Sequence, residues 1–410
     1  MTGSTRQKFI KGVDHTAVGI FLVLAFFLPI SKAIIEISFC MILFCFIVKT
    51  VFCKPSLDNL RVFFSNRINL SLLIFYLCIG LSLFASGPLF LKSFKAWFFK
   101  WGEGVLLFYF AQVFLKKEHI KSFVLIFLTS SLLIGIDGLY QKVTGIDFIR
   151  KNGLVGLDEA GQAIRATFNH YNSFATWLIV MFFINFGFIM SLKKIRLKTL
   201  MSPILLLIML NFIFTNSRAG WLSFLVVCVI FSLFYFKGKT RLLLVGFLVF
   251  FLIAIASTEP LRERFLWSFQ ERGDADRLKL WKVSFLMFKS SPIVGKGIGL
   301  FMHYFPKYST MNIQYAHNCY LQILAETGIL GFLSFFWFLW EIILKAIKNI
   351  KNQENDFLFS GMFAAFTAFL IHSFFDVQLY SLQLATLFWL LLILINLHLP
   401  KERIIVSNLE

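Results

Sequence analysis

The sequence predicts an all-α polytopic membrane protein with about twelve transmembrane helices. Of its 410 residues, 58% are hydrophobic and only 15% are charged, and the mean hydropathy is +0.78. Such a composition excludes an ordinary soluble domain. The apolar runs are also too long and too uniform to be the short alternating strands of a membrane β-barrel. We therefore expect one helical transmembrane domain over residues 1–410.

Twelve apolar stretches are the candidate membrane spans, because each is close to the length that a helix needs to cross a bilayer. They lie near residues 16–31, 33–52, 68–86, 97–115, 120–140, 172–190, 199–214, 219–236, 240–257, 319–344, 357–374 and 381–398. A basic segment precedes the first stretch, as in a signal peptide, but no small-residue cleavage site follows it. We therefore expect the first stretch to be a retained transmembrane helix.

The positions of Lys and Arg predict the orientation of these helices. With the N-terminus inside, the cytoplasmic segments carry 22 of these residues and the short outer loops carry 5. Because cytoplasmic loops are enriched in Lys and Arg, both termini are expected in the cytoplasm. The net charge of +19 is divided among short clusters between the apolar runs rather than gathered on one face. Nucleic acid is therefore not an expected partner.

Two long loops face outward on this topology. Residues 141–171 contain several glycines and mixed charges. Residues 258–318 form a larger loop between the ninth and tenth spans. Within that loop, apolar residues recur at helical spacing; they are Leu278, Leu280, Trp281, Phe285 and Phe288. We expect this part of the loop to be an amphipathic helix that lies in the membrane interface.

A polar outer segment passes into a long apolar helix within residues 314–331, and His317 lies at the junction. An imidazole in this position can act as a general base for a hydroxyl nucleophile. A histidine at a helix start also serves as a cap or as a packing residue. Asn318 is a good capping residue for a helix that begins at Cys319. Glu326, two to three turns into that helix, would be costly without a partner.

Two arginines in the outer segments are candidate phosphate ligands, because guanidinium groups bind phosphate in a bidentate way. Arg218 lies at the tight outer turn between spans seven and eight, where its alternative is to extend toward the lipid head groups. Arg277 lies in the larger loop, where its alternative is an ion pair with Asp274 or Asp276.

The remaining candidates for chemistry are few. His372 is followed by Asp376 on the same outer side, which favours it over the other histidines. The run from Gly295 to Gly299 contains three glycines but lacks the Gly-Lys-Ser/Thr sequence of a nucleotide-binding loop, and turn chemistry explains it. No cluster of cysteines, histidines and carboxylates has metal-ligand spacing, so neither a metal nor a cofactor is expected.

Four blocks on the outer side together resemble the O-antigen ligase and polymerase superfamily of bacterial envelopes. In chain order these blocks are Ala166–Asn172, Thr215–Trp221, Arg277–Phe301 and Ala316–Gly331. The resemblance extends over about residues 130–385, and the last block is the most specific. In the first block, His170 and Tyr171 stand where the family often has a proline between the two asparagines.

The resemblance implies a GT-C-like glycosyltransferase with a metal-independent, inverting mechanism at the periplasmic face of the bacterial inner membrane. Its donor would be a glycan linked to undecaprenyl diphosphate, and its acceptor a sugar hydroxyl of lipid A–core. By match to the family motifs, His317 would be the catalytic base, and Arg218 and Arg277 would hold the diphosphate. Among the polar residues of the same outer side, we expect substrate contacts from Asn169, Asn172 and Asn318, and support from Glu326, His372 and Asp376.

Three alternatives accompany the ligase. A ligase would transfer the whole glycan to lipid A–core and complete lipopolysaccharide, whereas a polymerase would add it to another lipid-linked repeat; the chain length and modest outer loops favour the ligase. Protein O-oligosaccharyltransferases usually add a periplasmic C-terminal domain, which is not expected here. A transporter or flippase for the same lipid-linked glycan suits twelve spans and would need Asp137 in span five. Against it, the polar candidates lie on the outer side rather than at the bilayer midplane.

Overall fold

The computed structural model describes residues 3–53, 64–157, 162–257, 259, 262–263, 271–310, 315–353 and 356–400. Its helices and short helical turns are α1 (Gly3–Phe27), α2 (Lys32–Cys53), α4 (Arg67–Leu81), η1 (Ser82–Ala85), η2 (Gly87–Leu89), α5 (Phe90–Lys95), the π-helical η3 (Ala96–Trp101), α6 (Gly102–Phe114), η4 (Lys117–His119), α7 (Ile120–Thr144), α8 (Tyr171–Ser191), α9 (Ile195–Met201), α10 (Pro203–Phe214), α11 (Arg218–Phe234), α12 (Gly238–Ala256), α14 (Glu271–Lys289), α15 (Phe301–Tyr304), η7 (Phe305–Lys307), α16 (Cys319–Asn352), α17 (Phe357–His372), η8 (Gln378–Tyr380) and α18 (Leu382–His398). Two short strands, β1 (Val155–Gly156) and β2 (Gln162–Ala163), pair antiparallel in the first long outer loop.

A helix, or a run of consecutive helices, occupies each of the twelve predicted spans. In the described part of the chain, eight helices are long and apolar enough to cross a membrane, and α11, α17 and α18 are apolar but shorter. The predicted fold class, an all-α polytopic membrane protein, is therefore confirmed. Twelve crossings stay a prediction.

The predicted start of the first span is too late. Helix α1 begins at Gly3 rather than near residue 16. Hydropathy marks only the apolar part of a helix, whereas backbone hydrogen bonding propagates into the polar residues before it at little cost. The extended helix allows Asp14 of α1 to form an ion pair with Lys49 of α2 at 2.6 Å.

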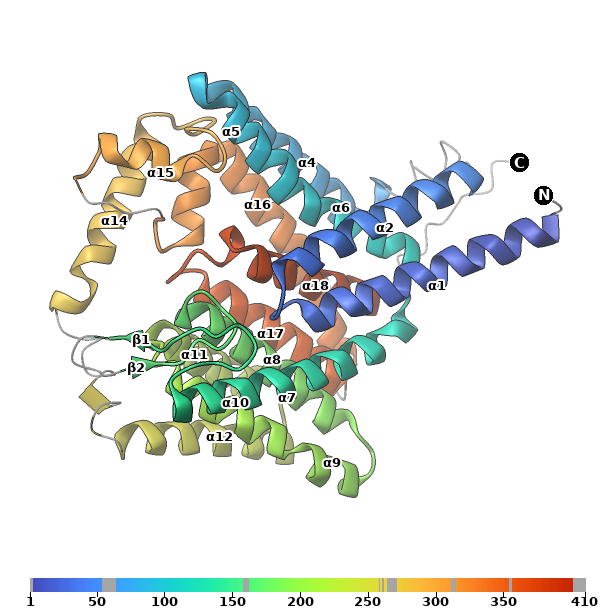
Figure 1. Cartoon of the computed structure of the whole chain (residues 1–410), viewed down its shortest axis with the longest axis vertical. Coiled ribbons are helices and arrows are strands. Elements are labelled where there is room, and N and C mark those ends of the chain that lie inside the picture. The colour runs from blue at the N-terminus through green and yellow to red at the C-terminus, as the bar shows by residue number, and fades with distance from the viewer. Residues whose placement is uncertain are drawn as a thin grey trace.

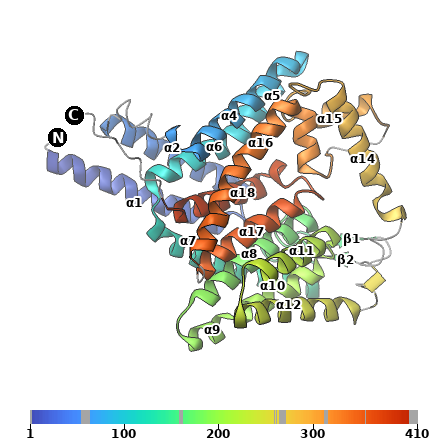
Figure 2. The same ribbon diagram turned by 180° about the vertical axis from the view of Figure 1, so that it is seen from behind.

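Helix α8 forms the centre of the bundle and packs closely on α17 (Figures 1 and 2). The two helices approach through Gly187 and Gly361. A Cβ on Gly187 would lie 2.7 Å from the Cα of Gly361 and 2.6 Å from the carbonyl oxygen of Phe357. Only glycine allows backbones to come this close, as in other membrane helix pairs.

The two ends of the bundle differ in character. The start of α1 lies at one end, while β1, β2, α14 and α15 lie at the opposite end (Figure 1). This arrangement matches the prediction that the segments 141–171 and 258–318 share a side, and that the N-terminus lies on the other. We call the end with α14 and α15 the outer end.

Helix α16 is not the uninterrupted helix that the sequence predicts. Gly328 has φ 65° and ψ −165°, which breaks the helical path inside Cys319–Asn352. The segment that follows α14 is inserted at the break: Ile329 N donates to the carbonyl oxygen of Pro292 at 2.8 Å, and Gly297 N donates to that of Glu326 at 2.9 Å. An average of hydropathy along the chain cannot detect a single dihedral of this kind.

The glycines of residues 295–299 have positive φ, and each is crowded by neighbouring groups. A Cβ on Gly295 would lie 2.3 Å from the carbonyl oxygen of Glu326. Gly295 therefore allows close backbone packing against α16, whereas Gly297 and Gly299 allow close packing against Ser86 and Ala96. This agrees with the turn chemistry expected from the sequence.

Helix α14 contains the residues that the sequence predicts to form an amphipathic helix in the larger loop. Leu280 and Met287 are buried against the small cluster of Phe301, Phe305 and Ala325, which joins α14 to α16. Not all of the predicted apolar positions face this cluster, because Leu278 remains 61% exposed and Phe285 45% exposed.

Candidate active site

A cavity of about 320 Å³ lies where the starts of α2, α8 and α16 meet the segment between α17 and α18. Its lining residues are Lys32, Asn169, His170, Ser173, Tyr315, His317, Asp376, Val377, Gln378, Tyr380, Ser381 and Leu382. Three of the residues predicted to form the site, Asn169, His317 and Asp376, therefore share one cavity, although they are widely separated in sequence.

His317 and Asp376 form a pair in this cavity. The Nδ1 atom of His317 lies 3.2 Å from Oδ1 of Asp376, and the histidine side chain keeps 37% of its accessible surface while the aspartate keeps 12%. His317 has φ 48°, in the left-handed region that residues other than glycine rarely adopt. Such strain persists only where the surrounding contacts impose it, and it is frequent at functional sites.

Backbone contacts around His317 explain how the pair is held. Cys319 N donates to the carbonyl oxygen of Ser373 at 2.9 Å, which joins the start of α16 to the end of α17. On the other side of His317, Ala316 N donates to the Oε1 atom of Gln322 at 3.0 Å. His317 is thus fixed from both sides and faces the segment that carries Asp376.

The charge of Asp376 determines how the imidazole is protonated. Burial opposes ionisation of the Asp376 carboxyl group, but the hydrogen bond and then the charge of His317 outweigh it and lower its pKa to about 2. Asp376 is therefore ionised near neutral pH and accepts a hydrogen bond from Nδ1–H of His317. The Nε2 atom of a neutral His317 is then left as the proton acceptor.

Two further histidines, His372 and His170, lie near the pair of His317 and Asp376. The Nδ1 atom of His372 lies 2.8 Å from the hydroxyl of Thr176 in α8, so this fully buried ring is fixed behind Asp376. His170 lines the cavity. The surrounding protein, and then the positive charges of His317, Arg165 and Arg277, lower the pKa of His170 against the attraction of Asp376. His170 is thus disposed to be neutral.

The two predicted phosphate ligands do not line the cavity. Arg218 is the first residue of α11 and follows Ser217, whose hydroxyl donates to Oδ1 of Asn172 at 2.7 Å. Asn172 therefore joins α8 to α11, which places Arg218 beside the start of α8. Arg277 in α14 acts electrostatically on both His170 and His372. The side chains of its proposed ion-pair partners, Asp274 and Asp276, are outside the described residues.

The side chains of Asn318 and Glu326 accept hydrogen bonds from backbone N–H groups and so fix the start of α16 and the segment inserted at its break. Asn318 caps α16, because its Oδ1 accepts from Leu321 N at 3.0 Å. The buried Glu326 carboxylate accepts from Gly299 N at 2.8 Å, Phe301 N at 3.0 Å and the Tyr380 hydroxyl at 2.9 Å. The predicted cost of a charge inside this helix is thus met by hydrogen-bond donors of the inserted segment and the cavity wall.

Tyr380 connects Glu326 to the cavity. Burial, and then the charge of Glu326, raise the pKa of Tyr380 well above its usual value. Its hydroxyl therefore stays protonated and donates to Glu326, while the residue lines the cavity.

Nine of the twelve lining residues are not among the sequence candidates, and they include Lys32, Ser173, Tyr315 and Tyr380. For Lys32 there was a signal, because it is one of only five basic residues in the short outer loops. The tyrosines and Ser173 belong to no motif and meet only through the folding of separate helices. Within the described ranges, no group of three or more His, Cys, Asp or Glu side chains could hold a metal ion.

The fold and this cavity define a class: a polytopic α-helical membrane protein with a histidine–aspartate pair at its outer end. Residues 203–336 match the family model described as O-Antigen ligase. The match confirms the predicted relationship to the O-antigen ligase and polymerase superfamily, whose members join glycans. A search of curated proteins finds no match to the chain. The matched stretch contains Arg218, Arg277, His317 and Glu326, whereas Asp376 lies beyond it.

Replacing Asp376 with asparagine is expected to lower transfer by about 10- to 100-fold, because a neutral amide no longer fixes the tautomer of His317 or stabilises the imidazolium. Since the pKa of Asp376 is about 2, its own titration lies far below the assay range. Initial rates of transfer near neutral pH therefore measure the effect. Unchanged turnover would contradict the pairing.

Proposed function

We propose that the protein is an O-antigen ligase. It transfers a glycan from undecaprenyl diphosphate to a sugar hydroxyl of lipid A–core at the periplasmic face of the inner membrane, and so completes lipopolysaccharide. The observation that carries this proposal is the pair of His317 and Asp376, with Nδ1 and Oδ1 3.2 Å apart, in a polar cavity of a chain that matches the O-antigen ligase model.

The reaction is one displacement at the anomeric carbon. The acceptor hydroxyl oxygen bonds to this carbon as the bond to the diphosphate oxygen breaks, and the configuration inverts. Nε2 of His317 takes the hydroxyl proton, and Asp376 stabilises the imidazolium that forms. The electron pair of the broken bond leaves with the undecaprenyl diphosphate, so the reaction needs no ATP.

Negative charge grows on the diphosphate during this step, and cationic side chains stabilise it. Lys32 lines the cavity, Arg218 begins the helix joined to Asn172, and Arg277 interacts with the histidines around Asp376. Cations fixed in advance in a poorly hydrated site lower the barrier because they need little reorganisation. We assign diphosphate binding to Arg218 and Arg277, with Lys32 as a third cation, and substrate contact to Asn169.

The contacts of Asp137 weigh against the transporter alternative. Oδ1 of Asp137 accepts from Phe148 N of the first outer loop at 2.8 Å. The carboxylate thus anchors the loop at the outer end of α7. A carboxylate that relays ions through a transporter would instead be needed near the bilayer midplane.

For the arginines, we expect Arg218→Ala and Arg277→Ala each to lose more transfer than the corresponding lysine variants, because lysine keeps the charge but loses the bidentate geometry. Initial rates with purified protein and lipid-linked glycan measure the effect. Arg150→Ala, in the first outer loop and away from the cavity lining, is the matched control. Equal losses in Ala and Lys variants would reject bidentate binding.

The ligase is tested most directly in a strain that lacks the gene. Bare lipid A–core with accumulated lipid-linked polymer is the expected glycolipid profile. Lipid A–core that carries a single repeat would instead indicate the polymerase. Purified protein should also transfer glycan to lipid A–core without ATP or an ion gradient, which a transporter would not do.

A further inference from the structure

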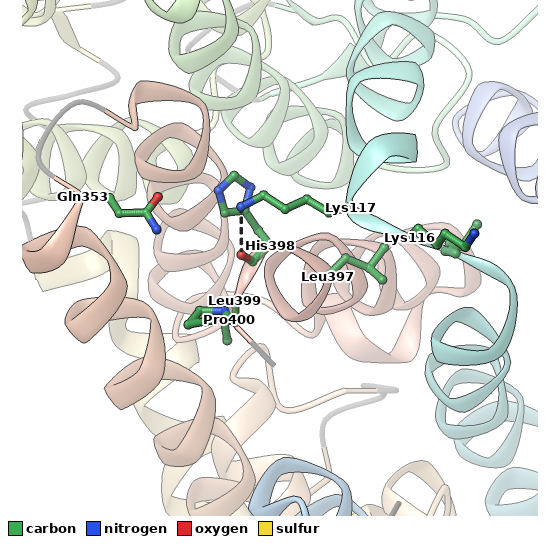
Figure 3. Close-up of a pocket in the computed structure, with 8 residues that line it drawn as sticks. Lys116, Lys117, Gln353, Leu397, His398, Leu399 and Pro400 are labelled. Carbon is green, nitrogen blue, oxygen red and sulfur yellow. Dashed lines mark hydrogen bonds between the residues drawn. The ribbon is translucent and has the colours of Figure 1, made fainter. Parts of the chain in front are cut away.

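A second cavity, of about 410 Å³, lies at the end of the bundle opposite the His317 cavity. Its walls come from the segment that follows α6 and enters η4, the end of α16 and the end of α18 (Figure 3). The lining residues are Leu115, Lys116, Lys117, Gln353, Leu397, His398, Leu399 and Pro400. Half of them are polar or charged and half are apolar.

The polar half of the lining is cationic. Lys117 extends across the end of α18, where its Nζ donates to the carbonyl oxygen of His398 at 3.4 Å, and Lys116 lies further toward the edge (Figure 3). The side chain of Gln353 approaches from the opposite wall. His398 is only 7% exposed, and its Nδ1 has no hydrogen-bond partner within the described part of the chain.

The nearby carboxylates do not cancel this charge. Nε2 of His398 lies 2.5 Å from Oδ2 of Asp356, whose other oxygen accepts from Phe359 N at 3.0 Å. Burial acts against ionisation of Asp356, but these hydrogen bonds and the charges of His398 and Lys117 lower its pKa. The Asp356 carboxylate is thus paired with His398. Glu118 is 70% exposed and lies 3.9 Å from His119 rather than in the cavity lining.

We propose that this cavity binds the phosphate group of an anionic phospholipid. Lys117 and Lys116 offer donors to the phosphate oxygens, and Gln353 offers an amide. The leucines and Pro400 offer an apolar wall to the glycerol and the first part of an acyl chain. Cavities that combine basic and apolar walls at the ends of membrane helices suit such head groups.

The position of the cavity fits this ligand. It lies at the end of the bundle that the distribution of Lys and Arg assigns to the cytoplasm, where anionic lipids attract basic segments. The bound lipid would bridge η4, α16 and α18. Because α18 begins at Leu382 in the His317 cavity and ends at His398 here, the lipid would stabilise a helix shared by both sites.

The test uses the purified full-length protein in neutral detergent micelles, titrated with phosphatidylglycerol, with phosphatidylcholine, or with inorganic phosphate. Retained lipid is counted by native mass spectrometry, and the thermal midpoint is followed in parallel. We expect phosphatidylglycerol to bind and to raise the midpoint more than phosphatidylcholine does. Lys117→Gln should weaken this binding about fivefold and the double variant Lys116→Gln/Lys117→Gln about 25-fold, since each basic residue near a membrane surface contributes about 1 kcal/mol, or about fivefold in affinity.

The chain offers a matched control in Lys193 and Lys194. This exposed adjacent pair precedes α9, on the side that the distribution of basic residues assigns to the cytoplasm, and is not among the residues that line the cavity. The variant Lys193→Gln/Lys194→Gln removes the same charge and should change binding less than twofold. Equal weakening by both double variants, equal binding of phosphatidylcholine, or an effect of inorganic phosphate without one of phosphatidylglycerol would overturn the proposal. None of these outcomes bears on glycan transfer.

Discussion

Replacing His317 with alanine is expected to lower glycan transfer by about 100- to 10,000-fold, which is the usual contribution of a general base. The physical reason is that Nε2 of His317 is the proton acceptor that the pairing with Asp376 leaves facing the cavity. Transfer from lipid-linked glycan to lipid A–core, measured with purified protein as initial rates, gives the effect.

The backbone at His317 calls for a second variant. Alanine tolerates φ 48° poorly, so a loss in His317→Ala alone could come from altered structure. Asparagine and glycine adopt this region more readily. We expect His317→Asn to be as inactive as His317→Ala, and imidazole added to His317→Gly to restore part of the rate. Near-normal turnover in His317→Asn, or no rescue of a folded His317→Gly, would reject the role as base.

The sequence predicts the helices of this protein well because hydropathy is summed over whole spans, and a span of about twenty apolar residues has few other solutions in a membrane. It also predicts that His317 and Asp376 lie on the same side, because that follows from counting spans and basic residues. Both inferences depend on properties averaged over many residues. Such averaged properties cannot predict that the two side chains lie 3.2 Å apart.

What the sequence could not predict depends on single contacts between distant segments. Tyr380 reaches the cavity wall because Glu326, 54 residues earlier, accepts a hydrogen bond from its hydroxyl. Asn172 and Asn318 have the residue type of a substrate ligand, yet their side-chain oxygens hold the starts of helices α11 and α16. A motif records which residues are present, whereas the partner of each side chain is decided by tertiary packing.

The largest structural effect is expected from Gly328→Ala. At φ 65° an added Cβ would lie 2.3 Å from the carbonyl oxygen of Ile293 and 2.6 Å from the nitrogen of Val294, which are backbone atoms that cannot rotate away. The inserted segment must therefore withdraw from α16. Glu326 would then lose the donors Gly299 N and Phe301 N and keep a buried charge with fewer partners, which costs several kcal/mol in a membrane protein interior.

We expect Gly328→Ala to lower the thermal midpoint in detergent by more than about 5 °C, which corresponds to a loss of a few kcal/mol, and to lower transfer more than tenfold, because Tyr380 on the cavity wall depends on Glu326. Gly246→Ala in α12 is the matched control, since no atom lies within 4 Å of its added Cβ and alanine favours a helix by about 1 kcal/mol over glycine. The control should be neutral or slightly stabilising. If Gly328→Ala keeps both the thermal midpoint and the turnover, the break in α16 does not hold the inserted segment in place. The hydrogen bond from Tyr380 to Glu326 would then not be needed for transfer.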